Sequence, residues 1–295
     1  MYLDYSMQSY AMQRWREAKL LQQQIAAMLQ DDAMAQCGQE VYMQYCKACG
    51  YVHITPSRTC KHRLCPTCQL RRSKRLAYNA RAVIAALQAR TDVPPYRLAL
   101  VTLTQRNVSG PSALRIEIDH LQDALSRFRY IKTARRDILG SVRTVEVTYN
   151  ADNDTWHPHV HLIVIGRKDS PVLTASWWQS TWAATRDLDY MPQVDCQIIT
   201  RDDCVYEVSK YVSKLTTLIN RCPEQLKAAR MRELNDALAG RNLIIYTGLW
   251  RSIRREIALS DDTDDTLPQH NPTCLGQVED AIMRWTGSEY VQIYP

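Results

Sequence analysis

Three histidines occur at alternate positions in the segment His157-Pro158-His159-Val160-His161. Side chains two apart on a β-strand lie on the same face, so a strand here would present all three imidazoles together. Four apolar residues follow at 162–165, which favours a strand fixed in a core over a chance cluster on a solvated strand. Two imidazoles on a rigid strand can bind one divalent cation, and His159 and His161 are the expected ligands.

A carboxylate that could complete this metal site lies upstream, at Glu146. The turn-rich segment 150–155 predicts a hairpin. If Tyr149 pairs with Trp156 across the turn, Glu146 lies opposite His159 on the same face. A slip of one residue would send Glu146 to the other face. Two imidazoles and one carboxylate leave open positions for water and a phosphate oxygen, and they suit Mn²⁺ or Mg²⁺.

A candidate nucleophile lies in the segment 206–214, which has helical periodicity. Glu207, Tyr211 and Lys214 fall within an arc of about 60° beside its apolar stripe. A phenol is a weak nucleophile near neutral pH, so Tyr211 would need a polarised phosphate and a nearby cation such as Lys214. Glu207 could act as general base for a second nucleophile. Taken alone, the segment is better explained as an ordinary amphipathic helix, and only the histidine strand favours a catalytic role.

Ten cysteines are present, and five of them fall between positions 46 and 68. Two CxxC pairs in this stretch have the form of metal knuckles, which deliver paired thiolates to tetrahedral zinc. A closed site with four protein ligands is structural rather than catalytic. The expected zinc ligands are Cys46, Cys49, Cys65 and Cys68, with Cys60, His62 and His53 as alternatives.

Positive charge is concentrated in residues 41–91, which hold ten Lys or Arg and no Asp or Glu, whereas the rest of the chain is net acidic. Such a field attracts the phosphate backbone of nucleic acids. A solvated basic face accounts for the charge alone equally well. The residues expected to contact DNA are Arg71, Arg72, Lys74, Arg75 and Lys210.

The elements that must position these side chains follow from periodicity and breakers. Helices are expected at 11–30, 69–90, 111–130, 172–185, 203–220 and 223–239, and strands at 97–104, 141–149, 156–165, 194–200 and 242–246. This order predicts an α+β fold with a largely antiparallel sheet. No long apolar run or secretory signal is seen, so a soluble cytoplasmic protein without a membrane span is expected.

Four segments are expected along the chain. They are a helical N-terminal segment at 1–43, a basic zinc-binding module with its helix at 44–93, a catalytic domain at 94–255 and an acidic C-terminal segment at 256–295.

Three motifs give the sequence a resemblance to a known family. They are Leu100-Val101-Thr102-Leu103-Thr104, the histidine segment preceded by Glu146-Val147-Thr148-Tyr149-Asn150, and the tyrosine segment from Glu207 to Lys214. In this order they resemble the rolling-circle plasmid replication initiators of the HUH endonuclease superfamily, in the single-tyrosine branch with an N-terminal zinc module. The resemblance covers roughly residues 44–255.

The resemblance implies a five-stranded antiparallel sheet flanked by helices, and nicking of one DNA strand at a plasmid origin. Tyr211 would become linked to the 5′ phosphate, and Glu207 matches a glutamate that is thought to activate water at termination. The sequence contains no phosphate-binding loop of a helicase, so a host helicase in the bacterial cytoplasm is an expected partner.

Two alternatives remain at this stage. Some transposases of the superfamily use two tyrosines on one helix, but Tyr206 and Tyr211 are five residues apart and project from different faces. A zinc-dependent DNA-binding regulator without catalysis would explain the basic cysteine module. That alternative leaves the histidine strand and the tyrosine segment without a role.

Overall fold

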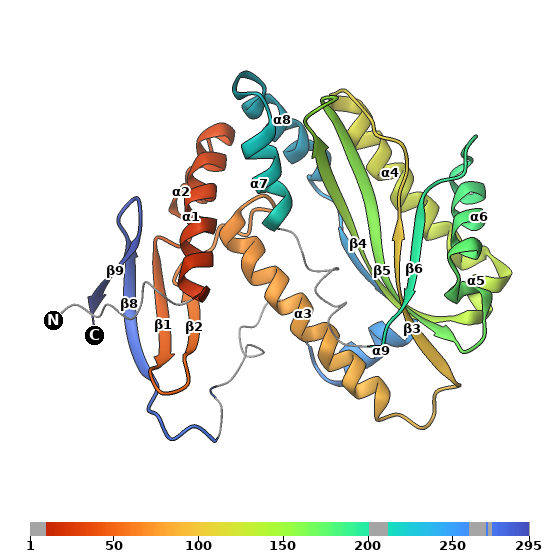
Figure 1. Cartoon of the computed structure of the whole chain (residues 1–295), viewed down its shortest axis with the longest axis horizontal. Coiled ribbons are helices and arrows are strands. Elements are labelled where there is room, and N and C mark those ends of the chain that lie inside the picture. Colours follow the sequence, from red (N-terminus) through yellow and green to blue (C-terminus); the bar gives the residue numbers. More distant parts are fainter. Residues whose placement is uncertain (1–9, 201–211, 260–269, 271–272, 295) are drawn as a thin grey trace. The chain divides into compact units, whose positions relative to one another are not determined.

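The computed structural model describes residues 10–200, 212–259, 270 and 273–294 (Figure 1). The chain divides into two compact units. Unit 1 comprises residues 1–75 and 261–295, and unit 2 comprises residues 76–260. Each unit has its own antiparallel sheet, and both sheets are flanked by helices.

The sheet of unit 2 has five strands in the order β6-β3-β5-β4-β7, and all neighbouring strands are antiparallel. Its strands are β3 (Tyr96–Leu103), β4 (Ile138–Asn150), β5 (Thr155–Arg167), β6 (Val194–Ile198) and β7 (Ile244–Thr247). Tyr149 pairs with Trp156 across the turn, so the predicted hairpin register is confirmed. The predicted fold class, an α+β domain around a five-stranded antiparallel sheet, is confirmed as well.

Helices cover both faces of this sheet (Figure 1). They are α4 (Pro111–Arg127), η1 (Phe128–Tyr130), α5 (Lys132–Asp137), η2 (Pro171–Leu173), α6 (Ala175–Arg186), α7 (Val212–Arg221), α8 (Glu224–Leu238) and α9 (Gly248–Glu256). Helix α4 contacts β5 and α6 contacts β3, and the buried Leu114, Ile118, Trp178 and Trp182 supply their apolar faces.

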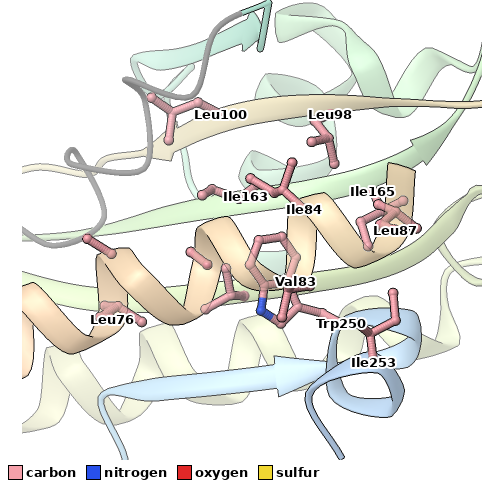
Figure 2. Close-up of a cluster of buried hydrophobic side chains, with 13 residues drawn as sticks. Leu76, Val83, Ile84, Leu87, Leu98, Leu100, Ile163, Ile165, Trp250 and Ile253 are labelled. Carbon is pink, nitrogen blue, oxygen red and sulfur yellow. The ribbon is translucent and has the colours of Figure 1, made fainter. Parts of the chain in front are cut away.

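The opposite face of the sheet carries a second layer of core. Here α3 (Pro66–Gln88) contributes Leu76, Val83, Ile84 and Leu87, and α9 contributes Trp250 and Ile253 (Figure 2). They pack on alternate residues of three strands, namely Leu98, Leu100, Val142, Ile163 and Ile165. Residues two apart on a strand, and three or four apart on a helix, lie on one face, so these apolar side chains all point into the same layer.

Unit 1 is built from both ends of the chain. Its elements are α1 (Tyr10–Leu29), α2 (Asp32–Gln36), β1 (Glu40–Cys46), β2 (Tyr51–Pro56), the start of α3, β8 (Glu279–Trp285) and β9 (Tyr290–Tyr294). The strands form a four-stranded sheet in the order β2-β1-β8-β9. The acidic C-terminal segment therefore supplies two strands that the sequence analysis did not predict.

The predicted helices agree with those observed to within a few residues at most ends. The exception is the predicted helix at 203–220, because α7 begins at Val212 and residues 203–211 lie outside the described part of the chain. Among the described residues, no helix combines the length and apolar character that a membrane crossing requires.

Candidate active site and cysteine clusters

One end of a sheet face in unit 2 carries a row of polar side chains. Along β5 the face that is apolar at Ile165 and Ile163 becomes imidazole at His161 and His159. The neighbouring strands change at the same level, since Thr102 and Thr144 both pair with His161. Three strands thus change from apolar to polar together, which indicates a site rather than an isolated polar residue.

Glu146 on β4 lies directly opposite His159 on β5, as the predicted register requires. Its Oε2 atom is 3.1 Å from His159 Nε2 and 2.9 Å from His161 Nε2. The ligand atoms of all three residues lie within 4.8 Å of one another, and Glu146 and His159 are buried. The structure therefore brings together the three residues that the sequence analysis expected to share a divalent ion.

The hydrogen bonds of the imidazoles orient their ring nitrogens. His159 Nδ1 is 3.1 Å from the carbonyl oxygen of His157, which only accepts, so Nδ1 carries the proton. In the neutral ring this leaves the lone pair of Nε2 facing the carboxylate of Glu146. A lone pair and a carboxylate at this distance are compatible when a proton or a cation lies between them. A second ring nitrogen held by a carbonyl is the usual arrangement behind a metal-binding histidine.

Two further contacts hold the row in place. Thr102 Oγ1 is 3.1 Å from His161 Nδ1, so a residue of the motif at 100–104 orients a histidine of the motif at 157–161. His157 does not join the cluster, and its Nδ1 is instead 2.7 Å from Asn107 Oδ1. The three imidazole rings nevertheless follow one another along β5, with centroid separations of 5.4 and 4.9 Å.

Helix α7 packs against β4, the strand that carries Glu146. Its buried side chains include Leu215, Leu218 and Ile219, and Cys222 just after it donates a hydrogen bond from Sγ to Tyr149 Oη at 3.5 Å. Lys214 lies within α7. The other proposed residues of the tyrosine segment, Glu207, Lys210 and Tyr211, lie outside the described residues.

Four thiols converge in unit 1, and they are Cys37, Cys60, Cys65 and Cys68. The Sγ atoms of Cys37 and Cys68 are 3.6 Å apart, and those of Cys60 and Cys68 are 3.7 Å apart. Hydrogen bonds from Cys65 to the neighbouring thiols, with Cys37 first, raise the pKa of Cys65, and burial raises it further. Four close sulfurs are the donor set of a structural zinc site, and these residues fit that ion.

This cluster corrects the expected zinc ligands. Cys65 and Cys68 belong to it, and Cys60, which was named as an alternative, is a member. Cys46 and Cys49 instead lie in a different cluster with His270 and Cys274. The two CxxC pairs were expected to share one ion because they are close in sequence, but β1 and β2 separate them in space.

The alternative ligands His62 and His53 belong to neither cluster. His62 Nδ1 accepts a hydrogen bond from the backbone N–H of Leu64 at 3.1 Å, and His53 Nε2 is 2.9 Å from Thr55 Oγ1.

Helix α1 presents polar side chains to the four-thiol cluster. Lys19 is fully buried, and its ammonium donates to the carbonyl oxygens of Cys37 at 2.5 Å and Ala35 at 3.4 Å. Burial lowers the pKa of Lys19, while the nearby thiols, with Cys37 first, raise it. Tyr290 on β9 donates to the carbonyl of Gly38 at 2.6 Å. A buried cation beside four thiols offsets the negative charge that they carry as zinc ligands.

The expected DNA-contacting residues of α3 follow the cysteine cluster. Lys74 is exposed, and Arg71 and Arg75 are half-buried. Arg72 instead donates to the carbonyl oxygens of Lys61 and His62, so it stabilises the loop between the cysteines.

The comparisons with known proteins decide the family. The sequence profile of a family described as a replication protein matches residues 51–291. The chain belongs to this replication protein family. A relative from Bacillus sp., named Protein rep, is 30% identical over 242 residues, which cover 74% of this chain and 77% of the relative.

Further relatives support the assignment. Another Protein rep, from Streptococcus pneumoniae, is 26% identical over 270 residues, covering 84% of this chain and 80% of the relative. One from Lentilactobacillus hilgardii is 29% identical over 269 residues, covering 84% and 83%. No solved structure matches the chain.

A second profile, described as a transposase zinc-binding domain, matches residues 6–93 of this replication protein. All four members of the four-thiol cluster lie inside that stretch. The zinc-binding domain of the replication protein and the geometry of the thiols therefore agree on a structural zinc ion. His270 and Cys274 lie well beyond the end of the match.

Sequence reasoning missed several residues of these sites. Cys37 and Cys274 were treated as scattered thiols, and His270 was interpreted as part of an acidic connection. The available signal was that a thiol pair in a knuckle needs two further donors, which could have prompted a search over the whole chain. No sequence signal marks Lys19, which looks like a solvated residue of a surface helix.

Proposed function

We propose that this replication protein starts rolling-circle replication of a plasmid by nicking one DNA strand at the origin. The nucleophile is the phenol of Tyr211, and Glu146, His159 and His161 hold a divalent cation beside the scissile phosphate. The observation that carries the proposal is the convergence of these three ligands on the sheet face, with Glu146 Oε2 within 3.1 Å of both imidazoles.

The reaction is a transesterification. The Tyr211 oxygen forms a bond to phosphorus, the bond from phosphorus to the 3′ oxygen breaks, and the phenol proton passes to that leaving oxygen. The products are a 5′ phosphotyrosine and a 3′ hydroxyl that can prime synthesis. Because one phosphate ester replaces another, the reverse attack by a 3′ hydroxyl rejoins a strand.

A divalent cation, Mn²⁺ or Mg²⁺, supplies polarisation of the phosphate and stabilises the charge that develops on its oxygens. Two nitrogens and one carboxylate oxygen fit such an ion and leave positions for the phosphate. Lys214 is proposed to favour the phenolate or to bind the phosphate, and Glu207 to act as base for water when the protein is released. Lys210 and the basic start of α3, with Arg71, Lys74 and Arg75, are proposed to contact DNA.

Helix α7 supports the choice of nucleophile. Leu215 is buried where α7 packs on β4, four residues after Tyr211 in the sequence. Residues four apart on a helix lie on one face. The helical periodicity of the sequence around Tyr211 is why the phenol of this residue is the proposed nucleophile.

The proposal is tested with labelled single-stranded origin DNA and Mn²⁺. The wild-type protein is expected to form a covalent adduct, and peptide mass analysis should locate the nucleotide on Tyr211. Tyr211→Phe should abolish the adduct, and Tyr206→Phe is the matched control that should retain it. An adduct that persists in Tyr211→Phe contradicts the assigned nucleophile.

A second candidate function is strand transfer in a transposase of the same superfamily. It is favoured by the match of residues 6–93 to a transposase zinc-binding domain. A host element with terminal hairpins, in place of a plasmid origin, would support it. The replication protein profile spans all of the described catalytic unit, so replication is the preferred function. A host helicase is the partner proposed for unwinding.

A further inference from the structure

We propose that Cys46, Cys49, His270 and Cys274 form a second structural zinc site, which joins the C-terminal segment to the N-terminal hairpin of unit 1. Their ligand atoms lie within 4.8 Å of one another. All four belong to unit 1, although they come from two segments more than two hundred residues apart in the chain. The proposal does not depend on the nuclease function.

The sulfur spacing suits tetrahedral zinc. With Zn–S bonds of about 2.3 Å, two thiolates on one ion are about 3.8 Å apart. The Sγ atoms of Cys46 and Cys274 are 3.8 Å apart. The corresponding separations in the four-thiol cluster are 3.6 to 3.7 Å, close to this value.

The turn between the first two ligands has the form of a zinc knuckle. β1 ends at Cys46 and β2 begins at Tyr51, and the chain reverses between them. Gly50 has φ of +69°, and its N–H donates to the carbonyl of Cys46 at 2.9 Å. The turn therefore brings Cys46 and Cys49 into the same cluster of ligand atoms.

The C-terminal ligands of the cluster are held in place by contacts of Gly276 and Tyr51. The N–H of Gly276 donates to Cys274 Sγ at 3.4 Å. A Cβ atom at Gly276 would lie 2.7 Å from Cys46 Sγ and 2.5 Å from Ala48 Cβ, so no side chain fits there. The backbone at Gly276 therefore approaches the knuckle directly. Tyr51 contacts the His270 ring edge to face, with a centroid separation of 5.6 Å.

Neighbouring strand contacts bring the two halves together at this point. Tyr45, just before Cys46, pairs with Glu279 on β8. The hydroxyl of Tyr45 donates to Glu279 Oε2 at 2.8 Å, and Lys47 Nζ lies 2.8 Å from Glu279 Oε1. The cluster thus closes the end of the β1–β8 ladder, where it fixes the register of the C-terminal strands.

Three thiolates and one imidazole favour zinc over hard cations. Hard cations such as Mg²⁺ and Ca²⁺ prefer oxygen, and this site offers none among its four donors. A disulfide between Cys46 and Cys274 is the main competing arrangement, since it would use the same two sulfurs.

The test counts zinc per chain by elemental mass spectrometry in full-length protein purified under reducing conditions. The wild-type protein is expected to hold two zinc ions, one for each cluster in unit 1. His270→Ala and Cys274→Ser should each lower the count to one. His270→Cys replaces the donor by another zinc ligand and should keep two. Cys196→Ser is the matched control, because this thiol belongs to neither cluster among the described residues.

Cobalt substitution adds a spectroscopic test, because only side chains that bind the metal contribute to the absorption of the bound Co²⁺. The wild-type protein should bind two Co²⁺ ions with thiolate charge-transfer absorption from both sites. His270→Cys should increase this absorption, because a fourth thiolate is added to the second site.

A wild-type count of one zinc ion, or a count of two in Cys274→Ser, overturns the proposal. Peptide mapping that finds a Cys46–Cys274 disulfide under these reducing conditions overturns it as well. Should Cys274→Ser fail to fold, the counts in the wild-type protein and in His270→Cys decide the question.

Discussion

Replacing Glu146 by Gln should separate the two roles that the geometry gives to this carboxylate. Without metal, the amide introduced by Glu146→Gln could donate to the lone pair that His159 Nε2 directs at this position, where Glu146 Oε2 now lies at 3.1 Å. A new buried hydrogen bond contributes about 1 kcal/mol, so the metal-free variant is expected to be slightly more stable. The affinity for the divalent cation should fall in the variant, because one of its three ligands loses its charge.

The size of the metal effect follows from linkage. Loss of an outer-shell partner already costs about 10- to 100-fold in metal affinity, so loss of a direct ligand should cost at least about 100-fold. Mn²⁺ at about 100 times the wild-type Kd stabilises the wild-type protein by about 2.7 kcal/mol. The same concentration stabilises the variant by about 0.4 kcal/mol. For a unit of this size, the expected shifts in Tm are about 8 °C and about 1 °C.

The assay is thermal unfolding of zinc-loaded protein with and without Mn²⁺, followed by a probe in unit 2. Glu233→Gln is the matched control, since Glu233 and Glu146 are both 7% exposed but Glu233 lies on α8 beside Arg230. The control should keep the wild-type Mn²⁺ shift. An equal Mn²⁺ shift in Glu146→Gln and the wild-type protein would refute the proposed metal site.

Further predictions concern catalysis and stability. Glu207→Ala should preserve the first nick but slow hydrolytic release of the 5′ end, and unchanged release in a single-turnover assay would remove its role as base. Lys19→Met should destabilise unit 1 by about 3 kcal/mol, because it removes a buried charge from its partners, and should speed zinc release to a chelator. Gly140→Ala should destabilise unit 2 by more than about 2 kcal/mol in denaturant unfolding, since its Cβ would lie 2.7 Å from the backbone nitrogen of Trp250. Arg136 and Ser170 lower the pKa of Asp137 to about 2, with burial opposing them, so the stability it contributes is complete above about pH 4 and is lost as the pH falls toward 2. Acid titration of Asp137→Asn should lack this loss.

The sheet of unit 2 was largely predictable because its signals are local. Alternating histidines predict a strand face, and the turn at 150–155 fixes the pairing of Glu146 with His159. The paired change from Ile163 to His161 on β5 and from Leu100 to Thr102 on β3 could also be inferred from alternation, once the register was known. These inferences need only the period of a strand and the length of a turn.

The zinc-binding half was less predictable because its ligands are brought together by long-range strand pairing. Cys46 and Cys65 look like members of one site when only spacing is considered. β8 pairs with β1, and this pairing brings Cys274 to the knuckle. The pairing of β1 with β8 and the burial of Lys19 leave no pattern in the neighbouring sequence, because both depend on contacts with segments elsewhere in the chain.

The arrangement of the four-stranded sheet has a consequence for biosynthesis. The β1–β2 hairpin leaves the ribosome early, yet β8, the second neighbour of β1, and β9 beyond it are made only after the whole of unit 2. At about 5–20 residues per second, the edge of β1 that pairs with β8 waits tens of seconds for that strand, whereas unit 2 can fold during translation. A nascent chain that stops before residue 279 would therefore carry a folded unit 2 attached to an incomplete unit 1.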